Sequence, residues 1–119
     1  MFKGLRTVIY PVKDAARAKA WYAQALGIEP YFDEPFYIGF NVGGYELGLD
    51  PNNDDPKASP TTYWGVDDIG EALGHLQTRG ATQHADVQDV GGGIKVASVQ
   101  DPDGNVIGLI ENPHFVAGS

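Results

Sequence analysis

One pattern occurs twice in the chain and constrains its fold more than any other feature. Each copy is an apolar-rich strand that reaches an aspartate, followed by a helical stretch that ends at glycine, over residues 7–27 and 61–80. A repeat of about half a domain cannot bury its hydrophobic face alone, so the two copies must pack together. The duplication predicts a single domain over residues 1–119, with module one over about 4–50, a linker over 51–60 and module two over about 61–112.

In the first module, residues 5–12 are rich in β-branched and aromatic side chains and predict a buried strand. Asp14 is placed to accept free amide hydrogens at the start of the following helix. Two further strands are expected over 36–42 and 45–49. The dipeptide Gly43-Gly44 between them tolerates the positive φ angles of a two-residue hairpin turn.

The second module repeats this order of elements. A strand over 62–66 leads to Asp68, the expected helix cap, and the helix is predicted to end at Gly80. Strands over 94–100 and 106–111 follow, joined by an Asp-Pro-Asp-Gly sequence that is typical of a tight turn. Each module is therefore predicted to contain a strand, a helix and about three strands.

Charge and composition exclude several classes of function. The net charge is −8, with only 8 Lys and Arg residues, whereas nucleic-acid binding needs a clustered basic surface. No apolar run approaches the roughly 18 residues of a membrane span. The chain has no cysteine, which rules out disulfides and thiolate chemistry. With no signal-like segment before the first strand, we expect a cytoplasmic protein without nucleic-acid or membrane partners.

Three motifs together resemble the vicinal oxygen chelate superfamily, which includes glyoxalase I, extradiol dioxygenases, fosfomycin resistance enzymes and bleomycin resistance proteins. The motifs are Val12-Lys13-Asp14 leading to Trp21-Tyr22 and Leu26-Gly27, then Gly65-Val66-Asp67-Asp68, and finally Asp101-Pro102-Asp103-Gly104-Asn105. The resemblance covers about residues 4–112. It implies an α+β fold in which two βαβββ modules form a curled mixed sheet around a cavity. It also implies a homodimer, often with the pocket at or near the interface.

The resemblance further implies four positions at which metal-dependent members carry ligands. In this chain those positions are Thr7, Glu46, Thr61 and Gly108. A threonine hydroxyl is a weak neutral donor, and glycine offers no side chain. A lone carboxylate cannot hold a catalytic metal, which usually needs three protein ligands. We therefore predict no metal and no cofactor, and the catalytic residues stay unassigned.

Other polar residues give weaker signals. His84 stands at the start of an expected strand and could face either way, while His114 lies in the tail; a contribution from either across a dimer stays open. Ser98 could face inward, but no residue near it in sequence identifies a base. The run 91–93 of three glycines lacks a following lysine, so it predicts a loop, and by resemblance a lip of the pocket, rather than a phosphate cradle.

Alternation along the strands defines which side chains share a face. Ile9 shares the face of Thr7, and Tyr63 shares the face of Thr61. The side chains on the opposite face of these strands should pack against the helices. The side chains expected to pack against the helices are Tyr10, Val12, Trp64 and Val66. The predicted cavity is thus apolar and aromatic, with one carboxylate. The candidate ligand-binding residues are Thr7, Ile9, Glu46, Thr61, Tyr63 and Gly108.

Glu46 has three possible roles. It could form an ion pair or reach solvent, it could anchor an amine-bearing ligand, or it could act as a general base. The favoured hypothesis is a metal-free protein that binds a small cationic or aromatic molecule. The alternative is a lyase, isomerase or dioxygenase of the same superfamily, with an atypical metal site or Glu46 as base. A third possibility is an accessory role for the dimer, so whether the chain is an enzyme stays open.

Overall fold

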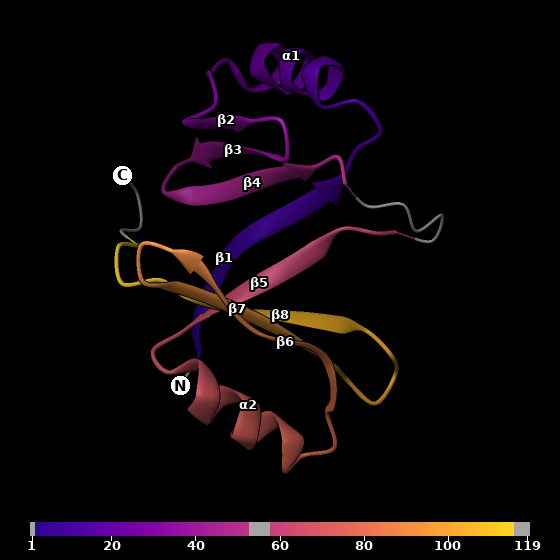
Figure 1. Ribbon diagram of the computed structural model, residues 1–119, viewed down its shortest axis with the longest axis vertical. Coiled ribbons are helices and arrows are strands. Elements are labelled where there is room, and N and C mark those ends of the chain that lie inside the picture. Colours follow the sequence, from indigo (N-terminus) through magenta and orange to yellow (C-terminus); the bar gives the residue numbers. More distant parts are fainter. Residues whose placement is uncertain (1, 53–57, 116–119) are drawn as a thin grey trace. The chain divides into compact units, whose positions relative to one another are not determined.

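The computed structural model describes residues 2–52 and 58–115, so the expected linker lies partly outside the described residues. Over this part of the chain it contains eight strands and two helices, labelled in Figure 1. Their bounds are β1 Phe2–Pro11, α1 Ala15–Leu26, β2 Phe32–Glu34, β3 Tyr37–Val42, β4 Tyr45–Asp50, β5 Thr61–Val66, α2 Ile69–Gln77, β6 Thr82–Gly91, β7 Ile94–Gln100 and β8 Val106–Glu111. Both modules therefore run strand, helix, three strands, and the α+β prediction is confirmed.

The chain divides into two compact units. The N-terminal unit comprises the described residues within 7–60, and the C-terminal unit comprises residues 2–6 together with 61–115. The strand β1 contributes to both, because its first residues belong to the C-terminal unit. In the described residues, neither helix is long and apolar enough to cross a lipid bilayer.

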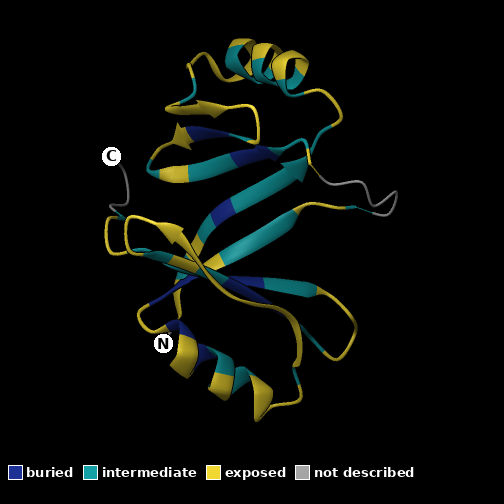
Figure 2. Ribbon diagram, in the orientation of Figure 1, coloured by how far each residue is buried: buried dark blue, intermediate teal, exposed yellow. Residues whose placement is uncertain are grey.

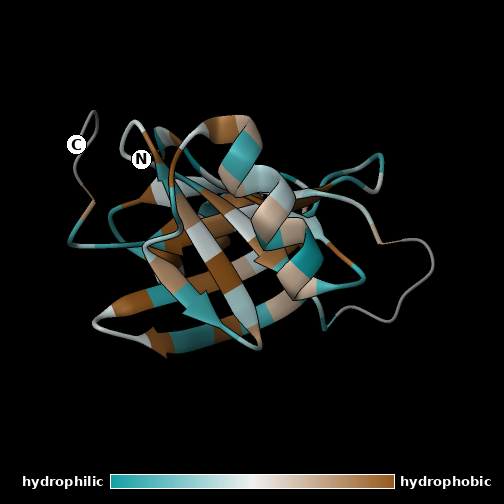
Figure 3. Cartoon of the chain, turned by 90° about the horizontal axis from the view of Figure 1, so that it is seen from above, coloured by the Kyte–Doolittle hydropathy of each residue, from teal (hydrophilic) through white to brown (hydrophobic). Residues whose placement is uncertain are grey.

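In the N-terminal unit the strands lie in the order β2-β3-β4-β1. β1 pairs in parallel with β4, while β3 is antiparallel to both β4 and β2. Gly43 and Gly44 have φ angles of 64° and 92°, as the predicted hairpin turn requires. Seen from above in Figure 3, α1 lies across the strands of this unit, and hydrophobic and hydrophilic residues alternate along the strands behind it.

The core of the N-terminal unit is small and lies in the sheet. Ile38, Phe40 and Leu49 are fully buried, and Tyr10 and Val12 pack against them on the helix side, as predicted. By contrast α1 has no buried residue, and Trp21 on this helix is 62% exposed. Figure 2 shows this difference as blue segments in β3 and β4 beside a helix that carries none.

In the C-terminal unit the order is β5-β8-β7-β6. β5 is parallel to β8, and β7 is antiparallel to β8 and β6. The core joins the sheet to α2 and consists of Val66, Ile69, Ala72, Ala97 and Leu109. Val66 thus packs as predicted. Trp64 does not, because its indole packs edge-on against Phe2, 6.0 Å between ring centroids, and stays 38% exposed.

Both helices start where the sequence predicts. The Asp14 carboxylate accepts a hydrogen bond from the Arg17 amide at 3.1 Å, and Asp68 accepts one from the Glu71 amide at 3.0 Å. α1 ends at Gly27 in the left-handed conformation, as expected. α2 already ends at Gln77, with Thr78 as its cap, so the predicted end at Gly80 is wrong by one short turn.

The Asp-Pro-Asp-Gly turn is held by the side chain of its first residue. The Asp101 carboxylate accepts the amide hydrogens of Asp103 and Asn105 and a further one from the Asn105 side chain. These hydrogen bonds, above all the side-chain bond from Asn105, hold the pKa of Asp101 below its usual range. Gly104 has a φ of 88°, which gives the left-handed exit predicted for this turn.

β6, like the short strand β2, is exposed along its whole length. All ten of its residues are exposed, and it stands at the end of the strand order (Figure 2). Its pairing with β7 is interrupted by three register shifts, between Gln83 and Ala85, between Ala85 and Gln88, and between Asp89 and Gly91. Such bulges bend a strand and raise its local twist.

Candidate functional site

The six candidate residues form one group in each unit. Thr7, Ile9 and Glu46 lie on β1 and β4 of the N-terminal unit. Thr7 stands opposite Glu46 in the parallel ladder, and Ile9 stands opposite Gly48. Because residues opposite one another share a face of the sheet, the Thr7 and Glu46 side chains lie together. Thr7 is 8% exposed, and Glu46 is half-buried.

Two tyrosines hold the Glu46 carboxylate. The Tyr31 hydroxyl donates to Oε1 and the Tyr37 hydroxyl donates to Oε2, so each oxygen accepts one phenol. In the described part of the chain no Lys or Arg nitrogen lies within ion-pair distance of Glu46. We call these three residues the Glu46 clamp. The ion-pair alternative for Glu46 is therefore replaced by hydrogen bonds to neutral donors.

Glycines in the strands make room for the two rings. A Cβ atom at Gly39 would come within 3.1 Å of the Tyr31 ring, and one at Gly48 would come within 2.6 Å of Tyr37 Cζ. A glycine inside a strand often marks such a close approach. Sequence reasoning missed both tyrosines, although Gly39 and Gly48 were the signal that could have pointed to them.

The clamp keeps Tyr31 protonated. Burial raises the pKa of the Tyr31 hydroxyl above its ordinary value, and the hydrogen bond to Glu46 and the negative charge of that carboxylate raise it further. Tyr31 is nevertheless 63% exposed as a residue, so its ring is accessible to a ligand while its hydroxyl points at Glu46. The Glu46 carboxylate, a hydrogen-bond acceptor, therefore lies beside aromatic surface that a ligand could contact.

The group in the C-terminal unit is arranged differently. Tyr63 stands opposite Gly108, and a Cβ atom at Gly108 would lie 2.6 Å from Tyr63 Cδ1. Gly108 pairs with Tyr63 and Ile107 pairs with Thr62, so Thr61 does not stand opposite Gly108. By register, Gly108 therefore corresponds to Gly48 of the other unit and not to Glu46. Counting from the Asp-Pro-Asp-Gly turn does not reveal this offset.

A histidine–serine pair lies on the same face as Gly108. Ser98 stands opposite Gly108, is 5% exposed, and its Oγ lies 2.8 Å from His84 Nδ1. His84 therefore turns toward Ser98, and a base does lie near this hydroxyl, although the two residues are 14 positions apart. His114 has another role: its Nε2 donates to the Gly92 carbonyl at 2.8 Å and so ties the tail to the glycine turn.

The donor set does not fit the metal site of the superfamily. Of the four positions Thr7, Glu46, Thr61 and Gly108, Glu46 alone offers a carboxylate, and the Tyr63 ring fills the space beside Gly108. Across residues 2–52 and 58–115, no three His, Asp or Glu side chains converge as a metal ion requires. The remaining candidates, Thr7 and Thr61, offer only neutral hydroxyls.

Two units of strand, helix and three strands, each with its first strand parallel to its last, define a duplicated α+β protein. The model of the Glyoxalase/Bleomycin resistance protein/Dioxygenase superfamily matches residues 4–109. The chain belongs to this superfamily, and the resemblance seen in its motifs is confirmed. A comparison with curated proteins finds no match.

Solved structures agree in fold. A glyoxalase/bleomycin resistance protein/dioxygenase superfamily member from Vibrio splendidus 12B01 has a TM-score of 0.68 at 17% identity, covering 91% of this chain and 99% of that one. A Streptomyces coelicolor methylmalonyl-CoA epimerase variant in complex with 2-nitronate-propionyl-CoA has a TM-score of 0.75 at 13% identity, covering 98% and 99%. The Mn(II)-bound glyoxalase from Novosphingobium aromaticivorans has a TM-score of 0.73 at 22% identity, covering 99% and 42%.

Proposed function

We propose that this superfamily member binds a small organic cation without a metal, and that Glu46 is the anchor. The observation that carries the proposal is the Glu46 clamp, in which a half-buried carboxylate is held by two neutral phenols. A carboxylate has about four lone-pair sites, so one phenol on each oxygen leaves acceptor capacity for a ligand ammonium group. The ligand ammonium group would then form the ion pair with Glu46.

The aromatic surroundings of the clamp favour an organic ammonium over an inorganic cation. The Tyr37 ring lies 6.1 Å from the Phe32 ring, and the Tyr31 ring is largely exposed. Aromatic faces attract organic cations, most strongly where the cation is also desolvated. A ligand that combines an ammonium group with an aromatic or apolar body would therefore use both parts of the site.

The enzymatic alternative draws on the similarity in fold to the epimerase and to the Mn(II)-bound glyoxalase. Under this alternative Glu46 would take a proton from the substrate, or an atypical metal site would form. The clamp itself does not separate the two functions, because the acceptor capacity left on Glu46 would serve a reacting proton as well as an ammonium group. The exposed aromatic surface beside Glu46 is what favours binding of an organic cation.

The proposal is tested by titrating the protein with benzylammonium and, as the uncharged match, benzyl alcohol. Calorimetry should show saturable binding of benzylammonium that falls at least about tenfold in Glu46→Gln, equivalent to roughly 1.4 kcal/mol. Glu34→Gln, on the exposed strand β2, removes the same charge outside the clamp and should leave the affinity unchanged. Equal affinity of wild type and Glu46→Gln would remove Glu46 from the site.

The metal-free part of the proposal has its own measurement. Protein purified without chelator should contain no stoichiometric Zn, Ni, Fe or Mn by elemental analysis. One full equivalent of any of these metals would overturn it and favour the enzymatic alternative.

A homodimer and a cytoplasmic location also belong to the proposal, because they are implied by the resemblance and by the composition. Sedimentation equilibrium should give twice the mass of 12.8 kDa for one chain. A single-chain mass at all concentrations would remove the dimer from the proposal.

A further inference from the structure

Arg6 occupies an unusual position in the C-terminal unit. Its guanidinium carbon lies 3.8 Å from the centroid of the Phe115 ring, which is a cation–π contact. The side chain lies flat on β5 at Gly65, where a Cβ atom would come within 2.7 Å of Arg6 Nε. Gly65 and Phe115 therefore fix the guanidinium plane between a strand and an aromatic ring.

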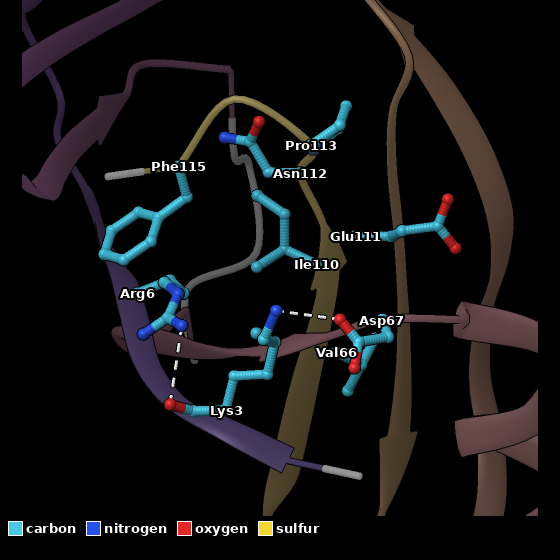
Figure 4. A pocket seen from close by; sticks show the side chains of 10 residues that line it. Lys3, Arg6, Val66, Asp67, Ile110, Glu111, Asn112, Pro113 and Phe115 are labelled. Atoms are coloured by element: carbon cyan, nitrogen blue, oxygen red, sulfur yellow. Dashed lines mark hydrogen bonds and ion pairs between the residues drawn. The ribbon is translucent and has the colours of Figure 1, made fainter. Parts of the chain in front are cut away.

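Arg6 lines a pocket of about 290 Å³, shown close up in Figure 4. Apolar side chains of Val66, Ile110 and Phe115 make up part of the wall beside it, and Lys3 and Asp67 lie at one side. The whole lining comes from the C-terminal unit. The pocket thus combines one fixed cation with apolar surface.

The guanidinium keeps most of its hydrogen-bonding capacity. It donates to two carbonyls of its own strand, Leu5 at 3.3 Å and Lys3 at 3.4 Å, and both hydrogen bonds are long. Within the described residues no carboxylate lies within 4.0 Å of it, although the chain has 16 acidic residues against 8 basic ones. An arginine has five N–H donors in a planar fork that matches a carboxylate.

The acidic residues of the pocket already have partners. Asp67 forms an ion pair with Lys3 at 2.8 Å, and the Glu111 carboxylate accepts the amide hydrogen of Ile69 at 2.9 Å. Neither carboxylate is therefore placed to neutralise Arg6. In an acidic chain, this leaves one half-buried cation with unused donors facing a partly apolar pocket.

We propose that this pocket is a second ligand site, which takes an organic carboxylate. Arg6 binds the carboxylate through two N–H groups, and the apolar body of the ligand packs beside Ile110 and Phe115. The site is independent of the Glu46 clamp, because it uses the opposite charge and residues of the other unit.

Benzoate is the probe, followed by NMR on the amide signals of the pocket and the Arg6 Nε–H signal. Benzoate should bind saturably, and Arg6→Gln should lower its affinity by at least about tenfold. Arg6→Lys should restore only part of this loss, because a lysine cannot bind both oxygens in a fork. Gly65→Ala keeps the charge but displaces the guanidinium, so it should also weaken binding.

Control variants test whether benzoate binds specifically at Arg6. Lys13→Gln removes one positive charge in the N-terminal unit and should not change benzoate affinity, nor should Glu46→Gln. Benzyl alcohol should not compete with benzoate. The proposal is overturned if benzoate does not bind saturably, if Arg6→Gln binds it as well as wild type does, or if inorganic phosphate binds equally well and thus shows a simple anion site.

Discussion

The two units share one order of elements but differ in what a tyrosine ring covers. In the N-terminal unit the tip of Tyr37 lies over Gly48 and reaches Glu46, whereas in the C-terminal unit the root of the Tyr63 ring lies over Gly108. The first arrangement leaves a carboxylate at the surface of the sheet, and the second leaves an aromatic ring. The same duplicated framework therefore carries a polar site in one half and a packed aromatic contact in the other.

The largest effect should come from filling the two glycines. We expect Gly108→Ala to lower the free energy of unfolding by about 3 kcal/mol, since the new Cβ would meet Tyr63 Cγ at 2.8 Å, close to its backbone. Gly48→Ala should cost about 1 kcal/mol, because the Tyr37 ring can swing its tip away.

Urea denaturation of both variants measures this difference. Gly74→Ala is the control. Gly74 lies inside α2, and a Cβ atom there would have no neighbour within 4 Å, so this substitution should stabilise the protein by about 0.5–1 kcal/mol. If Gly48→Ala lowers the free energy of unfolding more than Gly108→Ala does, the Tyr37 ring does not yield more easily than the Tyr63 ring, and the comparison fails.

The helix caps give the next comparison. Asp68→Ala should cost about 1 kcal/mol of global stability, because it frees the start of a helix that buries Ile69 and Ala72. Asp14→Ala should act more locally, since α1 buries no residue. Hydrogen exchange should therefore show faster exchange confined to α1 in Asp14→Ala, and equal global losses in the two variants would contradict this.

Removing the hydroxyl of Tyr37 or of Tyr31 should change stability by amounts that differ less than those of the two cap variants. Tyr37→Phe removes a half-buried donor from Glu46 and should cost about 1 kcal/mol. Tyr31→Phe removes a donor from a more exposed residue and should cost less. Thermal unfolding near neutral pH compares them; a larger loss in Tyr31→Phe would show that the exposed ring is the stronger partner of Glu46.

The last difference is expected at alkaline pH. The raised pKa of Tyr31 means that the unfolded chain loses this proton first, so folding stability should fall as pH rises above about 10. Glu46→Gln removes the negative charge that contributes to that shift and should bring the pKa of Tyr31 closer to its ordinary value. NMR of a Tyr31 ring carbon as a function of pH measures the pKa of Tyr31 in wild type and in Glu46→Gln, and Tyr31→Phe assigns the signal. Urea denaturation at several pH values measures the change in stability.

The framework of the fold could be predicted from the sequence because its signals are local. Asp14 and Asp68 cap their helices, Gly43 and Gly44 form the hairpin turn, and Gly104 ends the Asp-Pro-Asp-Gly turn. Each of these depends on backbone geometry within a few residues. The superfamily followed from the same motifs at their spacing in the chain.

The site could be predicted only in part. The resemblance assigned Thr7 and Glu46 to one site, and the register of β1 and β4 sets them opposite each other. The tyrosine partners of Glu46 could not be predicted, because their hydroxyls reach it from other segments of the chain. The same limit hid His84 beside Ser98, whose pairing follows from the irregular register of β6. Trp64 packs against Phe2 for a similar reason, because a contact between distant segments leaves no periodic signal.

The irregular register of β6 has a consequence for how the protein behaves at high concentration. An edge strand of ten exposed residues, with Val87 and Val90 among them, is a template on which another extended chain could pair. Three register shifts break its ladder into short stretches, so a straight incoming strand can match only a few of its backbone groups at once. The bulges therefore act as protection against aggregation, and straightening them would make the chain prone to form fibrils.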